Sequence, residues 1–84
     1  METQNVEAGA EHTFVVNGAE YDVTVEYNTI GSPEDHMFGS EKMKAHTSKG
    51  RNGLDITVGA DGSAEIRPRF NGNGQVERGE LEIR

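Results

Sequence analysis

The sequence predicts a mainly β domain of the β-rich α+β class, built on an antiparallel sheet. A two-stranded hairpin and a three-stranded meander are joined by a short helix or an irregular loop. Three observations support this prediction: apolar and polar residues alternate with period two, Asn-Gly turn signals recur, and 84 residues suffice for one small domain. We expect residues 1–10 to be a flexible tail and residues 11–84 to form the single domain.

The first hairpin is expected around Asn17-Gly18, because Asn-Gly strongly favours a two-residue type I′ turn. Strand 12–16 would pair with strand 19–27, in which tyrosines and valines alternate with polar residues. This pairing sets Val16 opposite Ala19 and keeps the apolar side chains on one face.

The second hairpin is expected between residues 54–58 and 63–70. The sequence LDITV at 54–58 alternates with period two, and the loop 60–62 ends in a glycine suited to a left-handed backbone. Val58 should therefore pair with Ala64.

The last strand, 75–84, is expected to complete the meander by pairing with 63–70. An apolar pairing of Ile66 with Leu81 requires one extra residue, so we predict a β-bulge at Gly79. The expected core consists of Phe14, Val16, Tyr21, Val23, Val25, Ile56, Val58, Ile66, Phe70, Leu81 and Ile83.

The intervening stretch 31–53 has the weakest pattern. Ser32-Pro33 resembles a helix start, with a capping residue followed by proline in the first turn. Gly39 interrupts the apolar stripe that follows. We expect one to three helical turns at most, and then an irregular loop over 44–53.

Charge is divided unevenly along the chain. The first 41 residues contain nine acids and no lysine or arginine, whereas the remainder contains eight bases and six acids, so the net charge is −7. Such asymmetry is informative about partners and not about fold. It favours a protein partner with a basic surface, such as a nucleic-acid-binding protein, and argues against nucleic acid itself and anionic membranes.

The candidate partner-binding residues lie in the acidic half. Glu20, Asp22 and Glu26 share the polar face of the predicted strand 19–27, with no local base to neutralise them. Carboxylates two residues apart on a strand are separated by roughly 7 Å, which is of the order of phosphate spacing in nucleic acids. Glu34 and Asp35 join them as candidates. The alternative is an acidic, solvated face that aids solubility.

A basic segment, 42–51, is the second candidate site. Lys42, Lys44, Lys49 and Arg51 could bind an anion through a glycine-rich loop, although no P-loop spacing is present. The alternative is a solvated connection. The stretch 39–69 contains no aromatic residue, which argues against a base-stacking platform.

The sequence contains no arrangement typical of catalysis or metal binding. His12, His36 and His46 lack the spacing of a helical metal site, and the chain has no cysteine. No serine stands in a nucleophile motif. We therefore expect a non-enzymatic protein without a metal or cofactor.

Three function classes follow. The first is a small acidic protein-binding module, of the kind represented by phage-type inhibitors and nucleic-acid mimics, that docks on a basic protein surface. The second is a structural or assembly protein, such as a virion or tail component, that pairs through sheet edges. The third is a nucleic-acid binder that uses the basic segment.

Two further expectations concern assembly and location. One exposed apolar sheet face should seek a second layer, supplied either by Met37, Phe38 and Met43 of the linker or by a second copy packed face to face or joined at sheet edges, and we favour a homodimer. No apolar run approaches a membrane span and no signal-peptide pattern is present, so we expect a cytoplasmic protein, in a host cell if the protein is viral.

Overall fold

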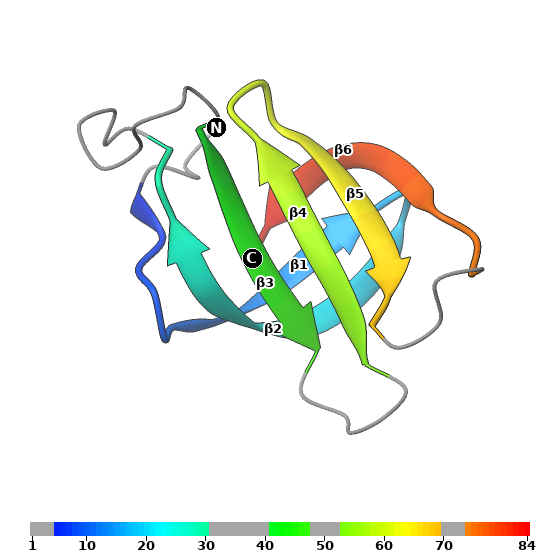
Figure 1. Cartoon of the computed structure of the whole chain (residues 1–84), viewed down its shortest axis with the longest axis horizontal. Helices are drawn as coiled ribbons and strands as arrows, with labels where there is room; N and C mark the ends of the chain where they lie inside the picture. Colours follow the sequence, from blue (N-terminus) through cyan, green and yellow to red (C-terminus); the bar gives the residue numbers. More distant parts are fainter. Residues whose placement is uncertain (1–4, 31–40, 48–52, 70–73) are drawn as a thin grey trace.

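The computed structural model describes residues 5–30, 41–47, 53–69 and 74–84. In these ranges six antiparallel strands close into a barrel, in which β6 returns to pair with β1 (Figure 1). No α-helix occurs in the described ranges, and the prediction of a mainly β, antiparallel fold is confirmed. The strands are β1 (Glu11–Val16), β2 (Ala19–Asn28), β3 (Lys42–Thr47), β4 (Leu54–Gly59), β5 (Ser63–Pro68) and β6 (Glu77–Ile83).

The β1–β2 hairpin has the predicted register. Val16 pairs with Ala19, and the two residues between them form the turn. Asn17 and Gly18 have φ angles of 53° and 81°, as a type I′ turn requires. The twist of such a turn matches the twist of the flanking strands, so the hairpin forms from local signals alone.

The β4–β5 hairpin is also confirmed. Val58 pairs with Ala64, and Gly62 adopts the expected left-handed backbone with φ of 89°. The backbone N–H and the hydroxyl of Ser63 donate to Asp61 Oδ1 at 3.0 and 2.8 Å. These hydrogen bonds lower the pKa of Asp61 because they favour the charged carboxylate, and the one from the backbone has the larger effect.

The stretch 31–53 corrects the prediction of a helix or loop. Residues 42–47 form a full strand, β3, which pairs with β2 on one side and β4 on the other. Met43 and Ala45 point into the barrel and are 0% exposed. Two inward side chains that alternate with polar residues are enough for a strand because the neighbouring strands on both sides supply hydrogen bonds. The helix start expected at Ser32-Pro33 lies outside the described residues.

β6 pairs with β5 as predicted, but the predicted register is wrong. Ile66 pairs with Glu77 and not with Leu81, and Ala64 pairs with Gly79. The β5–β6 ladder runs through Gly79 without a shift in register, so the predicted bulge is absent.

The physical reason is that β6 has two neighbours. Leu81 pairs with Val16 and Ile83 with Phe14, so the apolar residues of β6 meet β1. The observed register differs from the prediction by an even number of residues, so the same side chains still face inward. Closure of the barrel therefore decides the register of β6.

The glycine of β6 has a different role from the predicted one. The side chain of Asn17 reaches over from the β1–β2 turn, and its Nδ2 donates to Glu77 Oε1 at 3.1 Å and to the carbonyl of Arg78 at 3.0 Å. A Cβ on Gly79 would lie 2.4 Å from Asn17 Oδ1. The hydroxyl of Tyr21 donates to Oε2 of the same Glu77 at 3.4 Å. Burial, and to a smaller extent the negative charge of Glu77, raises the pKa of Tyr21.

Part of the expected tail lies against the barrel. Within residues 5–10, Val6 is 7% exposed and belongs to the core, and its carbonyl accepts a hydrogen bond from Asn28 Nδ2 at 2.8 Å. The N–H of Gly9 donates to the carbonyl of Val25 at 2.8 Å. One apolar side chain and a few backbone hydrogen bonds thus attach this segment.

The barrel interior is filled by side chains. Of the predicted core, Tyr21 and Ile83 are only partly buried, and Phe70 lies outside the described residues. Val6, Ile30, Met43, Ala45 and Ala64 were not predicted. The observed core is Val6, Phe14, Val16, Val23, Val25, Ile30, Met43, Ala45, Ile56, Val58, Ala64, Ile66 and Leu81.

The closed sheet removes the argument for a homodimer. The apolar face of the sheet, which was expected to pack against a second layer, faces the interior of the barrel, where its side chains pack against one another. Among the described residues, the large apolar side chains that remain exposed are Tyr27 at 37% and Val76 at 38%. The homodimer therefore stays a prediction without this support.

Candidate functional site

The closure of the barrel extends the acidic stripe of β2. Glu20 pairs across the sheet with Val15, and Val15 pairs on its other side with Glu82 of β6. Two carboxylates therefore flank one valine on the outer surface, separated by two strand spacings, or roughly 10 Å. We call the outer surface of β6, β1 and β2 the acidic face. Its exposed carboxylates are those of Glu11, Glu20, Asp22, Glu80 and Glu82.

Arg84 lies among these carboxylates, which corrects the expectation that the stripe has no base, whereas Arg78, also on the outer surface of β6, is paired with Glu65 of β5. Arg84 Nη1 is 3.7 Å from Glu20 Oε1, and Nη2 is 4.0 Å from Glu82 Oε2. The three side chains are 56%, 59% and 64% exposed, for Arg84, Glu20 and Glu82 respectively. Exposed, loosely formed ion pairs contribute little to stability. The acidic face therefore keeps a net negative charge of several units.

Short polar contacts order the rest of this face. Thr13 Oγ1 donates to Asp22 Oδ1 at 3.0 Å, and the N–H of Arg84 donates to the carbonyl of Thr13 at 2.9 Å. Val15, between the acids, is 7% exposed but is not part of the barrel interior. The acidic face therefore contains one carboxylate held by a hydrogen bond, that of Asp22, and one nearly buried apolar side chain, that of Val15.

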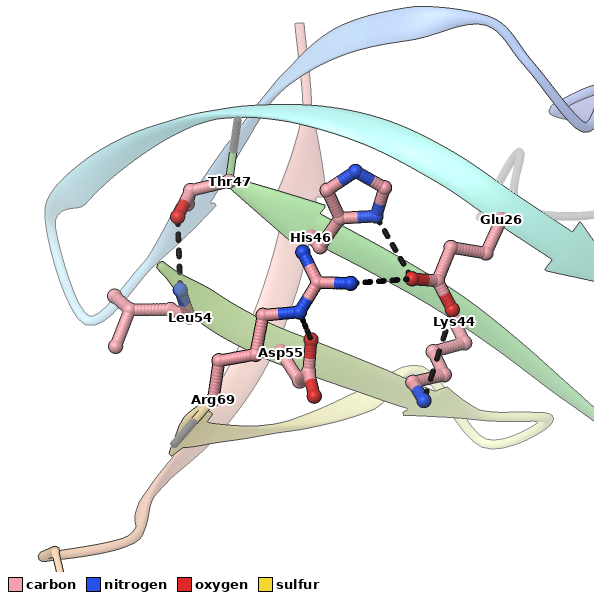
Figure 2. Close-up of polar contacts among 7 residues, drawn as sticks. All are labelled: Glu26, Lys44, His46, Thr47, Leu54, Asp55 and Arg69. Carbon is pink, nitrogen blue, oxygen red and sulfur yellow. Dashed lines mark hydrogen bonds and ion pairs between the residues drawn. The ribbon is translucent and has the colours of Figure 1, made fainter. Parts of the chain in front are cut away.

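Glu26 does not belong to the acidic face. The pairing of β2 with β3 shifts between Val25 and Tyr27, which leaves Glu26 as the extra residue of a β-bulge. Its Oε2 lies 3.6 Å from Lys44 Nζ, and its Oε1 lies 2.9 Å from His46 Nδ1 (Figure 2). Glu26 therefore lies on the outer surface beside Lys44 and His46, whose side chains alternate along β3 with the buried Met43 and Ala45.

Arg69 completes a half-buried charge cluster. Its guanidinium lies between Glu26 Oε1 and Asp55 Oδ1, 3.7 Å from each (Figure 2). Asp55 is the cross-strand neighbour of His46 in the β3–β4 ladder. The five side chains come from three strands and from the residue after β5, so the cluster fastens neighbouring strands together. Its members are Glu26, Lys44, His46, Asp55 and Arg69.

Two atoms of the charge cluster are not satisfied. His46 Nδ1 and Asp55 Oδ1 are buried and have no hydrogen-bond partner. His46 Nδ1 is nevertheless 2.9 Å from Glu26 Oε1, so the two atoms are in electrostatic contact without the alignment of a hydrogen bond. The exposed fraction of the side chains in this cluster ranges from 22% for His46 to 34% for Lys44 and Arg69. This burial and the mixed charge make the cluster a structural fastening, which leaves little of Glu26 available to a partner.

The predicted basic loop is divided by the structure. Lys42 is exposed and Lys44 contacts Glu26, but both lie on β3 and not on a loop. Lys49 and Arg51 lie outside the described residues, as do Glu34, Asp35 and His36. The structure therefore brings Glu20 and Asp22 together with β6, and separates Glu26 and Lys44 from both predicted sites.

A second charged group joins β5 to β6. Glu65 accepts hydrogen bonds from Arg67 Nε and from Arg78 Nε, the latter at 3.1 Å. The hydrogen bond from Arg67, and to a smaller extent that from Arg78, lowers the pKa of Glu65. Like the charge cluster, this group pairs its acid with local bases, in contrast with the acidic face.

Hollows at the barrel surface are shallow. His12 and Arg84 line two adjacent ones, of about 380 and 470 Å³. The larger has apolar walls from Val6, Leu81 and Ile83. Within the described residues no group of three or more His, Asp or Glu side chains could hold a metal ion.

Comparisons with known proteins do not identify the chain. No protein-family model matches it, and no significant match is found to a curated protein or to a solved structure. The described residues include no helix long and apolar enough to cross a membrane. The site must therefore be interpreted from its own chemistry.

The sequence missed Glu80, Glu82 and Arg84 as members of the acidic face. Their alternation along the last strand was visible, but their position beside β1 depends on closure of the barrel. Likewise, Arg69 and Asp55 meet Glu26 only because β3 lies between β2 and β4.

Proposed function

We propose that the protein is a small, non-enzymatic protein-binding module whose acidic face docks on a basic protein surface, as an inhibitor or nucleic-acid mimic does. The observation that carries this proposal is the addition of Glu80 and Glu82 to the predicted acids Glu20 and Asp22 through the pairing of β6 with β1. Four carboxylates on neighbouring strands form a two-dimensional pattern, whereas the sequence alone offered a single stripe.

The exposure of these acids supports a role outside folding. The carboxylates of Glu65 and Glu26 are paired with bases from neighbouring strands, which is how this barrel uses charge for stability. Glu80 and Asp22, in contrast, are exposed and have no salt bridge among the described residues. Unneutralised, exposed charge is well suited to steering a basic partner and to the rate of association.

The other two function classes receive less support. Pairing through sheet edges requires an unpaired strand, and each of the six described strands has a neighbour on both sides. A nucleic-acid binder would use the basic segment, but Lys44 is directed toward Glu26. The protein-binding proposal is therefore the one that the geometry favours.

The test begins with capture of a partner from the native host by the tagged protein. The variant E20Q/D22N/E82Q should then associate with that partner roughly ten-fold more slowly, because three steering charges are removed. Its circular dichroism should be unchanged. Binding by the wild type should weaken as salt is raised, because exposed charges are screened.

A matched pair of single variants gives the control. E82Q and E7Q each remove one exposed negative charge, but only Glu82 lies on the acidic face. E82Q should slow association and E7Q should leave it close to that of the wild type. Equal association rates for the triple variant and the wild type would reject the proposal. Loss of binding on replacement of Lys42, Lys49 and Arg51 would instead indicate an acidic partner.

A further inference from the structure

The last strand is the most weakly attached element of the barrel. β6 makes three residue pairs with β1 and four with β5. The β2–β3, β3–β4 and β4–β5 ladders each have five pairs, and the β1–β2 ladder has six. Both seams that bound β6 are therefore the shortest in the molecule as described.

The side chains of β6 also contribute little to the core. Within Glu77–Ile83, Leu81 alone is buried, whereas Gly79 and Ile83 are half-buried and the other four residues are exposed. The outer face of the strand carries three of these exposed residues, Arg78, Glu80 and Glu82. Removing β6 from its place would expose Leu81 and part of Ile83, together with the parts of Phe14 and Val16 that they cover.

The contacts that hold β6 are few and specific. Asn17 Nδ2 donates to Glu77 and to the Arg78 carbonyl at the start of the strand. At its other end the N–H of Arg84 donates to the carbonyl of Thr13. Opening therefore requires loss of two short ladders, of the Asn17 hydrogen bonds and of the exposed Tyr21–Glu77 and Arg78–Glu65 contacts. It leaves the other five strands paired with one another.

We propose that β6 is an exchangeable strand, and that the slot between β1 and β5 accepts the β6 strand of a second copy of this chain. The occupant follows from the register, because β6 of another copy offers the same apolar residues to Phe14 and Val16 and the same glycine beneath Asn17. All seam contacts are then formed again between copies.

The chain is long enough for the exchange. Residues 69–76 connect β5 with β6, and eight residues span at most roughly 26 Å when extended. The barrel measures 33 × 26 × 22 Å. The strand of one copy can therefore reach the slot of another that lies beside it.

Two single-cysteine variants test the proposal on the full chain, which has no cysteine of its own. Val15 pairs with Glu82 across the β1–β6 seam, so V15C in one copy meets E82C only when β6 has been exchanged. When the two variants are mixed and oxidised, the mixed disulfide dimer should accumulate well above either homodimer. A matched mixture of V15C with K42C, an exposed position on β3, which pairs with neither β1 nor β6, should not form it.

The Asn17 contact gives a second arm. Asn17→Gly keeps the left-handed turn but removes the hydrogen bonds to β6. When both mixed variants carry this substitution, the initial rate of mixed-dimer formation should rise at least roughly five-fold, the factor that corresponds to the lower limit for the loss of two hydrogen bonds. An unchanged rate would mean that β6 does not detach in this way.

Hydrogen exchange provides a measurement that needs no variant. The N–H of Leu81, which donates to the carbonyl of Gly62 at 3.0 Å, should exchange through a local opening faster than the amides of β4. If Leu81 exchanges only with global unfolding, or if the V15C and E82C mixture forms no more mixed dimer than homodimer, the proposal is overturned.

Discussion

The close approach of Asn17 to Gly79 allows a quantitative test of how the barrel closes. A methyl group on residue 79 would lie 2.4 Å from Asn17 Oδ1 and 2.8 Å from Asn17 Cγ, well inside van der Waals contact. The Asn17 side chain would have to move away, and it would lose its hydrogen bonds to Glu77 Oε1 and to the Arg78 carbonyl. The substitution G79A therefore acts through Asn17.

The magnitude follows from these two bonds. Each exposed hydrogen bond contributes about 0.5–1.5 kcal/mol, so their loss costs about 1–3 kcal/mol. Replacing glycine with alanine returns about 0.4–1 kcal/mol through a less flexible unfolded chain. We expect G79A to reduce the free energy of unfolding by about 1–2 kcal/mol.

The double variant separates the clash from other effects of alanine. N17G removes the side chain that alanine would meet and keeps the turn, since glycine adopts a φ near 53° without strain. In the N17G background, G79A should be neutral or slightly stabilising. The interaction energy of the cycle should then be about 1–3 kcal/mol, the cost of the two hydrogen bonds.

Urea unfolding followed by far-ultraviolet circular dichroism of the four proteins measures the cycle. If G79A has the same cost with and without Asn17, the clash does not cause the loss of stability. The Asn17 side chain would then not be what fastens the β1–β2 turn to β6.

Three further predictions concern the core and titratable groups. Met43→Ala should lower the free energy of unfolding by about 2–5 kcal/mol, measured by urea unfolding, because Met43 is fully buried in the strand missed by sequence reasoning; a cost typical of an exposed loop position would contradict its placement. Asp61 has a lowered pKa in the folded state, so its contribution to stability is present above pH 3.8 and is lost as the pH falls through the folded value. Asp61→Asn should therefore flatten the acid limb of a stability–pH profile, and an unaltered limb would contradict the Ser63 hydrogen bonds. Tyr21 has a raised pKa, so its contribution is present below pH 10.0 and is lost as the pH rises through the folded value; Tyr21→Phe should flatten the alkaline limb, and an identical limb would argue against burial of the phenol beside Glu77.

The local parts of the fold could be predicted from the sequence. The turn at Asn17-Gly18 and the loop that ends at Gly62 each carry their own signal, and each register then follows from the alternation of the flanking strands. No knowledge of distant residues is needed for either hairpin.

The parts that were missed depend on distant partners. β3 has the sequence KMKAHT, in which only Met43 and Ala45 are apolar, and alanine favours strands weakly. The strand exists because β2 and β4 lie on its two sides. In the same way, the register of β6 is decided by β1, whose Phe14 and Val16 lie almost a full chain length away.

The candidate site shows the same division. Glu20 and Asp22 could be recognised from alternation on one strand, but their neighbour Glu82 could not, because adjacency in a barrel is not a local property. Glu26 was assigned to the same stripe because the bases that neutralise it, Lys44 and His46, lie on β3, a strand that the sequence pattern did not predict.

The pairing of β1 with β6 also has a consequence for the emergence of the chain from the ribosome. Translation delivers β1 early and β6 late, so the nascent chain carries two unpaired strand edges, on β1 and β5, until the last strand is released. Contacts between such distant segments form slowly. The exposed carboxylates of Glu11, Glu20 and Asp22 lie on or beside the β1 edge during this interval, and charge of one sign discourages strands of neighbouring nascent chains from adding to it.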